Sequence, residues 1–294
     1  MQRHVLLGLM LLIGGNIFSS LYDVSIKYLP DDANPATFLM TRQISAVLML
    51  LPIWYFLKCP KPAAYGVHIA RANIGVIGSL ALVIGISALP IATVCAIFYS
   101  FPLFIMVFGF FFFKERVKSY QWLCGVLGFI GIMVILRPNQ ISWAGIAALI
   151  SAISFAISQL TLKKLSINDH PIVPLLYFSL LGVPLTIVMA ATQGFVGLSW
   201  EMFWVGIAGN SFLITYHGMC VIAYRQAQAS DLAIAEYFGL LFVVFLGWLL
   251  FDEWLDGLTW FGAGLIILPS LILPGLFKKL KDSKIQPLDP VSPA

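Results

Sequence analysis

The sequence predicts an all-α integral membrane protein with ten transmembrane helices in two inverted five-helix repeats. Of its 294 residues, 60% are hydrophobic and 10% are charged, and the mean hydropathy is +0.95. Soluble domains carry about 25% charged residues, so most of this surface must face lipid. The apolar residues occur in runs of roughly 17 to 22, which is long enough to cross a ~30 Å hydrocarbon core as helix.

The runs are helices and not strands. Transmembrane strands alternate apolar and polar residues, and a stretch such as residues 94–113 does not alternate. Backbone groups in lipid must also be satisfied within the segment. The first run, from Val5 to Ile26, is too long for the core of a signal peptide, so it is kept as a helix. The expected spans are 5–26, 36–57, 69–88, 91–113, 119–136, 143–162, 172–192, 201–222, 232–250 and 258–277.

The distribution of Lys and Arg predicts the orientation. With the N-terminus inside, fourteen of the seventeen basic residues are cytoplasmic, Lys27 and Arg137 are external, and Arg42 lies within a span. Lys and Arg are enriched in cytoplasmic loops, so we expect an inner-membrane protein with both termini in the cytoplasm. The cytoplasmic set is Arg3, Lys58, Lys61, Arg71, Lys114, Arg116, Lys118, Lys163, Lys164, Arg225, Lys278, Lys279, Lys281 and Lys284.

Several function classes are disfavoured. The net charge of +4 resides in short loops and the tail, which argues against nucleic-acid binding. The cysteines are far apart, without a CxxC pair or an adjacent histidine, so we expect no disulfide, metal site or cofactor. They are Cys59, Cys95, Cys124 and Cys220. The partners that we expect are a small-molecule substrate and membrane lipid. A homodimer is compatible with the sequence, which leaves the oligomeric state open.

An intramembrane enzyme is the main rival interpretation. Tyr22-Asp23 is similar to the first motif of aspartyl intramembrane proteases, but the second motif, Gly-x-Gly-Asp, is absent. The chain also has no His-Glu-x-x-His, no Gly-x-Ser-x-Gly and no Walker A sequence. We therefore expect a protein that is not an enzyme and does not use ATP directly.

The two halves of the chain resemble each other at a constant offset of 138 residues. The matched pairs are Tyr99 with Tyr237, Gly109 with Gly247, Glu115 with Glu253, and Trp122 with Trp260. These matches predict a first repeat over 1–138, a second over 139–277, and a disordered cytoplasmic tail over 278–294. Because each half has five spans, the repeats insert with opposite orientation. Such inverted repeats are typical of secondary transporters with a substrate site near the midplane.

The residues also resemble a known family. Pro102, Glu115, Trp122, Gly128-Phe129 and Arg137-Pro138 are similar to the EamA-type repeat of the drug/metabolite transporter superfamily. The second half is similar from Glu236-Tyr237 through Gly247-Trp248, Glu253, Gly262 and Gly264. The resemblance implies that Glu115 and Glu253 are architectural.

Within the superfamily, the sequence is most similar to the branch of bacterial S-adenosylmethionine transporters, and EamA-type riboflavin importers are also similar. The stretches that carry this similarity are Ser19 to Leu29, Gly128 to Gly131, Ala152 to Ala156, and Lys163-Lys164. One departure is Ile234-Ala235-Glu236-Tyr237, which stands where the family usually has Ala-Pro-x-Tyr.

Polar residues inside spans are costly, so each is a functional hypothesis. Asn16, Ser20, Asp23 and Lys27 are spaced to form one stripe on the first helix, which either lines a substrate site or bonds neighbouring helices. We take Asn16 and Asp23 as substrate candidates. Arg42 is a further candidate, although a pair with Asp23 or Glu236 that joins two helices is the favoured role.

The second half supplies further candidates. Gln159 lies beside a stripe of Ser and Thr residues, for which lining and close packing are equal alternatives. Asn210 and His217 share one face of the eighth span, where a satisfied core histidine is the simpler interpretation. Glu236 either receives a cationic group, exchanges a proton, or pairs with Arg42. Tyr99 and Tyr237, at equivalent repeat positions, could stack on a planar ring or a sulfonium.

These inferences predict a secondary transporter. We expect it to move a small polar organic metabolite, nucleoside-like or heteroaromatic, by alternating access, with S-adenosylmethionine or riboflavin as examples. The alternative is an exporter of amino acids or related metabolites, in which Glu236 and Arg42 meet the two charges of the substrate.

Overall fold

The computed structural model describes residues 3–30, 32–62, 64–114, 117–136, 142–165, 169–226 and 229–283. Within them the secondary structure is helical throughout. The first half contains α1 (Arg3–Ile26), α2 (Pro35–Phe56), α3 (Tyr65–Ala88), α4 (Ile91–Phe98), α5 (Phe101–Phe113) and α6 (Ser119–Leu136). The second contains α7 (Trp143–Thr161), a 3-10 turn (Leu162–Lys164), α8 (Ile172–Thr192), α9 (Trp200–Gln226), α10 (Ala229–Phe251) and α11 (Gly257–Ser283). The predicted repeat partner Glu115 and the external Arg137 lie outside the described residues.

The all-helical membrane class is confirmed. Seven described segments are long and apolar enough to cross a membrane, with α4 and α5 counted together. Three apolar helices are shorter by the same measure, Ser119–Ile135, Ala235–Phe251 and Gly257–Leu273. Ten complete crossings therefore stay a prediction.

Three differences from the expected spans bear on function or on the tail. Helix α3 begins at Tyr65, four residues before the expected span, so Arg71, which we counted with the cytoplasmic residues, lies well inside the helix and is only 2% exposed. The fourth span is broken between Phe98 and Phe101. Pro102 explains this break, because it has no N–H to donate and its ring clashes with the carbonyl four residues earlier. Finally, α11 continues to Ser283, beyond the point at which we expected the tail to begin.

Local chemistry sets several helix ends. Asn34 caps the start of α2, and its side-chain oxygen accepts from the backbone N–H of Ala36 at 2.9 Å. Pro35 occupies the first helical position, which suits proline. Ser142 begins α7 in the same way and accepts from Gly145 N at 3.1 Å. These caps satisfy donors that a helix start otherwise leaves unpaired.

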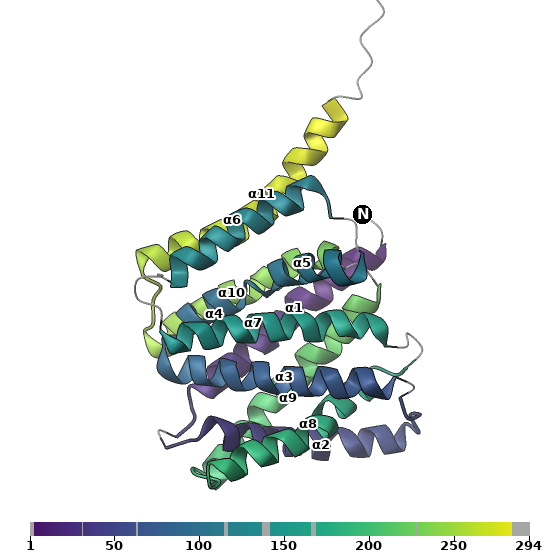
Figure 1. Ribbon diagram of the computed structural model, residues 1–294, viewed down its shortest axis with the longest axis vertical. Coiled ribbons are helices and arrows are strands. Elements are labelled where there is room, and N and C mark those ends of the chain that lie inside the picture. The colour runs from purple at the N-terminus through teal and green to yellow at the C-terminus, as the bar shows by residue number, and fades with distance from the viewer. Residues whose placement is uncertain are drawn as a thin grey trace, which may run out of the picture.

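The helices pack as a layered bundle (Figure 1). Helix α1 packs on α9 and α10, while α7 packs on α3, α4 and α5. Helix α2 pairs with α8 at one edge, and α6 pairs with α11 at the opposite edge. The α6–α11 pair approaches closely because Gly131 and Gly262 face each other, and a Cβ on Gly131 would lie 2.5 Å from the Gly262 carbonyl oxygen.

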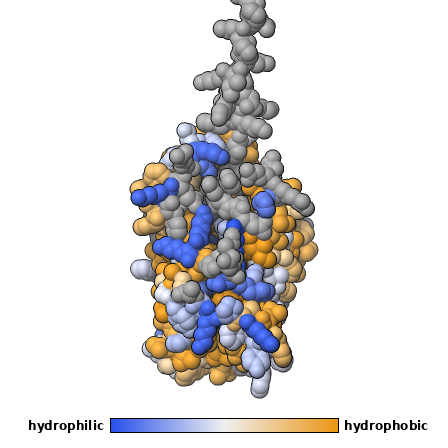
Figure 2. Space-filling model, turned by 90° about the vertical axis from the view of Figure 1, so that its right-hand side faces the viewer, coloured by the Kyte–Doolittle hydropathy of each residue, from blue (hydrophilic) through white to orange (hydrophobic). Residues whose placement is uncertain are grey.

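Polar and apolar side chains occupy different parts of the surface, as expected for a protein inserted in a membrane. Hydrophilic side chains gather on the end face of the bundle, and apolar side chains cover its flanks (Figure 2). Large apolar residues are strongly exposed, among them Phe112 at 75% and Trp143 at 86%. Exposed apolar flanks of this extent indicate contact with lipid.

Candidate functional site

A partly open cavity lies inside the bundle, where about 580 Å³ is free of protein atoms when open solvent is included. Residues from α1, α2, α3, α4, α7, α8 and α9 line it, so both halves of the chain contribute. The polar lining consists of Ser19, Asp23, Arg42, Arg71, Ser79, Ser151, Ser158, Gln159 and His217. The aromatic lining consists of Tyr22, Phe98, Phe155, Phe178 and Tyr216.

Two arginines from neighbouring helices reach this cavity. Arg42 is 1% exposed, and its Nη1 donates to the hydroxyl of Tyr22 at 3.1 Å. Arg71 is 2% exposed, and its Nη1 donates to the carbonyl oxygen of Pro174 at 3.1 Å. Its guanidinium also lies 4.8 Å from the ring centroid of Phe178, a cation–π distance. The expected pair of Arg42 with Asp23 or Glu236 is wrong, because Tyr22 takes that place.

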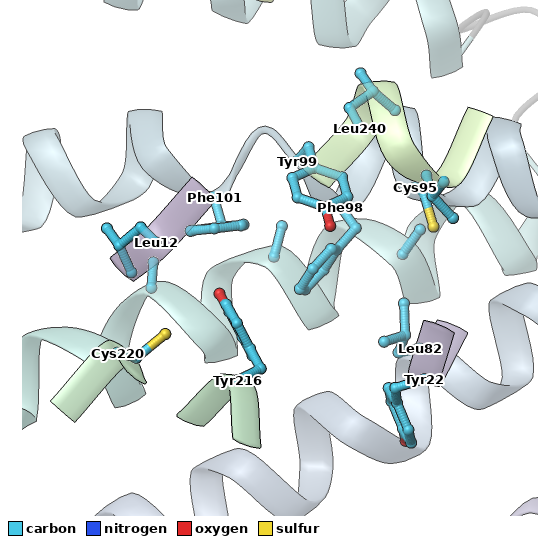
Figure 3. Close-up of a cluster of buried hydrophobic side chains, with 14 of the residues drawn as sticks. Leu12, Tyr22, Leu82, Cys95, Phe98, Tyr99, Phe101, Tyr216, Cys220 and Leu240 are labelled. Atoms are coloured by element: carbon cyan, nitrogen blue, oxygen red, sulfur yellow. The ribbon is translucent and has the colours of Figure 1, made fainter. Parts of the chain in front are cut away.

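Aromatic rings form one wall of the cavity. Phe155 contacts Phe98 at 5.4 Å between ring centroids and Phe101 at 4.6 Å, both edge to face. Its ring is nearly parallel to that of Tyr216, with centroids 6.3 Å apart. Phe98 and Tyr216 face the same interior space in Figure 3. Such a wall offers flat apolar surface to a planar ligand.

Besides Arg42, three polar side chains in the lining are candidates that the sequence suggested. Asp23 is 1% exposed, and one of its carboxylate oxygens accepts from the thiol of Cys95 at 3.7 Å. Gln159 is 2% exposed, and its amide nitrogen and oxygen have no hydrogen-bond partner among the described residues. His217 also lines the cavity, where its ring contacts Phe155 and Phe178.

Glu236 does not line the cavity and lies behind its wall. The carboxylate is fully buried and accepts three hydrogen bonds. Tyr224 donates at 2.8 Å, Tyr216 at 3.0 Å, and the Asn16 amide at 3.2 Å. Asn16 also donates to the Ala235 carbonyl oxygen at 3.2 Å. Asn16 and Glu236 therefore join α1, α9 and α10 in one polar shell.

The other candidates also lie outside the cavity lining. Tyr99 is 1% exposed, and its ring packs against Gly239 of α10, where a Cβ would collide with it. Tyr237 is 2% exposed in the same helix. The Asn210 amide lies 3.6 Å from the sulfur of Met49. Of the nine substrate candidates that the sequence suggested, the cavity lining includes Asp23, Arg42, Gln159 and His217.

A second polar cluster lies at the end of α1. Lys27 pairs with Glu253 at 2.9 Å and also donates to the Leu89 carbonyl oxygen at 3.3 Å. The other oxygen of Glu253 accepts from the backbone N–H of Ile91 at 2.6 Å and so caps α4. This is the architectural role that the family resemblance implied for Glu253.

Sequence reasoning missed Arg71 and did not single out Phe98, Phe155 or Phe178 as lining residues. The signal for Arg71 was its position only two residues into the expected third span. Phenylalanines in an apolar run carry no comparable signal, because lipid-facing and cavity-facing rings look alike in sequence.

Comparison with known proteins bears on this site. Residues 6–137 match the EamA-like transporter family. An S-adenosylmethionine uptake transporter of Rickettsia bellii is 27% identical over 92% of this chain and 94% of its own length. A riboflavin transporter of Rhizobium johnstonii is 29% identical over 70% of this chain and 69% of its own length. A crystal structure covering 96% of this chain and 99% of its own shares the fold, with 14% identity and a TM-score of 0.63.

Proposed function

We propose that this EamA-type transporter of the drug/metabolite superfamily carries a nucleoside-like or heteroaromatic metabolite across the inner membrane. The observation that carries the proposal is the interior cavity, which sets charged and amide groups against a wall of aromatic rings. Ligand sites combine such apolar walls with a few polar groups that fix orientation. The names of the relatives, S-adenosylmethionine uptake transporter and riboflavin transporter, indicate ligands of this chemical kind.

Alternating access between two inverted repeats is the mechanism that we propose. In the proposed repeats α1 corresponds to α7, α3 to α9, and the α4–α5 pair to α10. Under this correspondence, the contacts of α1 with α9 and α10 match the contacts of α7 with α3 and with the α4–α5 pair. It also maps the pairs α2–α8 and α6–α11 onto themselves. Lys114 and Asp252, 138 residues apart, both adopt a left-handed backbone at a helix end, with φ of 52° and 54°. These equivalences support repeats over 1–138 and 139–277 that rock about the cavity.

The orientation that we propose has both termini in the cytoplasm. Its support is the bias of Lys and Arg towards one set of loops. In this orientation the Lys27–Glu253 pair lies at the external end, where it joins α1 to the start of α4 and the loop after α10. The pair would then help to close that end of the cavity.

The amino-acid exporter is not favoured. It depended on Glu236 and Arg42 meeting the two charges of one substrate. Glu236 is enclosed by Asn16, Tyr216 and Tyr224 and is absent from the cavity lining. Glu236 and Arg42 therefore do not meet one substrate in this cavity, and the relatives' names do not favour an amino acid either.

Uptake of labelled S-adenosylmethionine into proteoliposomes tests the proposal. We expect saturable uptake that is stimulated by internal S-adenosylhomocysteine, as an exchanger requires. Uptake of labelled riboflavin is measured in parallel, and unlabelled riboflavin is added as a competitor. Phe155→Ala, which opens the aromatic wall, should reduce uptake, whereas Phe112→Ala on the exposed flank should not. Absence of uptake of both compounds above empty liposomes, in folded protein, would overturn the proposal.

A further inference from the structure

The two arginines of the cavity have donors that the protein does not use. The Nε and Nη2 groups of Arg42 and the Nε group of Arg71 are buried without a hydrogen-bond partner among the described residues. The hydrogen bonds that Arg42 and Arg71 do make go to neutral oxygens, those of Tyr22 and Pro174. Both side chains are more than nine-tenths buried.

An unpaired guanidinium inside a membrane protein is costly, because its charge and its N–H groups lose water. Arg also remains charged at any accessible pH, so it does not escape this cost by losing a proton. Buried polar groups without partners call for a specific explanation. In a cavity that receives a ligand, the ligand itself can supply the missing acceptor.

The described cavity lining contains too little negative charge to neutralise both arginines. Asp23 is the carboxylate in the described lining, and its oxygen already accepts from Cys95. Glu236 is separated from the cavity by Tyr216 and is held by three donors. Even if Asp23 swung to one arginine in another conformation, the second guanidinium would keep an unmatched charge.

We infer that Arg42 and Arg71 form a carboxylate-binding subsite, so that the transported metabolite carries a carboxylate as well as a planar ring. The fork of N–H groups on a guanidinium matches the two oxygens of a carboxylate. Asp23 lines the same cavity and would bind a cationic group of the substrate. This inference rests on the proposed function and narrows it, because it favours a zwitterionic nucleoside-like compound over a neutral flavin.

The test compares two substrates that differ by the carboxylate alone. Labelled S-adenosylmethionine and its decarboxylated analogue are offered to proteoliposomes of the wild type, Arg42→Gln, Arg71→Gln and Arg71→Lys. Arg225→Gln is the matched control, because Arg225 also donates to a backbone carbonyl, that of Asp169, and lies outside the cavity lining.

In the wild type we expect kcat/KM for S-adenosylmethionine to exceed that for the decarboxylated analogue by about 10- to 100-fold, the usual effect of a lost charged hydrogen bond. Arg71→Gln and Arg42→Gln should each remove much of this preference by slowing S-adenosylmethionine and sparing the analogue. Arg71→Lys should recover part of it, and Arg225→Gln should leave it unchanged.

Equal transport of the two substrates by the wild type would overturn the inference and leave the proposed function standing. An arginine variant that slows both substrates equally would assign the side chain a structural role and would also overturn it. Binding is measured separately, from the thermal stabilisation of purified wild type by S-adenosylhomocysteine and by 5′-methylthioadenosine, which lacks the amino-acid group. If transport fails for every probe, the proposed function falls, and equal or absent stabilisation by these two ligands overturns the carboxylate subsite independently.

Discussion

Tyr224→Phe removes one of the three donors that hold the buried carboxylate of Glu236. The Tyr224 hydroxyl lies 2.8 Å from Oε1, and Tyr216 and Asn16 both bond to Oε2. The substitution therefore removes the Tyr224 donor from Oε1 of Glu236. Because Glu236 is fully buried, water is not available to replace the bond.

The magnitude follows from the burial of the acceptor. A buried polar atom that loses its hydrogen-bond partner costs about 1–3 kcal/mol. Phenylalanine keeps the ring of Tyr224, so the substitution opens no cavity large enough to add a packing loss. We expect the free energy of unfolding to fall by about 1–3 kcal/mol.

Reversible unfolding by sodium dodecyl sulfate in mixed micelles measures this change. Tyr28→Phe is the control, because Tyr28 is 54% exposed, and a change at such a position is expected within about 0.5 kcal/mol. The decisive comparison repeats Tyr224→Phe in a Glu236→Leu background, where the hydroxyl has lost its acceptor. The reasoning is refuted if Tyr224→Phe costs the same in both backgrounds, since the stabilisation would then not come from the carboxylate.

Three further substitutions test other contacts, each by the same unfolding measurement. Glu253→Gln breaks the ion pair between Lys27 and Glu253, in which each side chain is 21% exposed. The free energy of unfolding should fall by about 0.5–1 kcal/mol, and a larger fall would show that the pair is less solvated. Gly239→Ala places a Cβ on the ring of Tyr99 and should cost about 1–3 kcal/mol, so an unchanged stability would contradict this close approach. Asn34→Ala removes the cap of α2 and should cost about 1 kcal/mol, whereas Asn34→Asp should retain most of the stability.

The helical spans were largely predictable, because hydrophobic length and turn residues are local properties of the chain. The exceptions were local as well. Pro102 breaks the fourth span into α4 and α5, which the continuous apolar run concealed. The start of α3 at Tyr65 was hidden by polar residues in its first turns, so the expected span began four residues late and Arg71 was counted with the cytoplasmic residues.

The cavity was only partly predictable, because helical spacing shows which residues share a face but not what that face meets. Asn16 and Asp23 lie on one stripe of α1, as expected, yet Asn16 meets α10 while Asp23 reaches the cavity. Glu236 was the sharpest candidate because it is a carboxylate within a span. Its three donors come from α1 and α9, and no pattern within α10 could reveal them.

Glu236 and the two cavity arginines are all buried, but they differ in whether the protein completes their hydrogen bonds. A buried carboxyl group is tolerated when its oxygens have hydrogen-bond donors, and both oxygens of Glu236 find them within the protein. Such a group stabilises one arrangement of α1, α9 and α10. Arg42 and Arg71 keep unused donors in the cavity, so their free energy falls when a ligand supplies an acceptor. A group that is completed only by ligand can couple binding to a change of conformation, whereas one that is already complete cannot. We therefore expect the substrate to be recognised at Arg42 and Arg71. Glu236 has a structural role, because it binds Tyr216, a residue of the cavity lining.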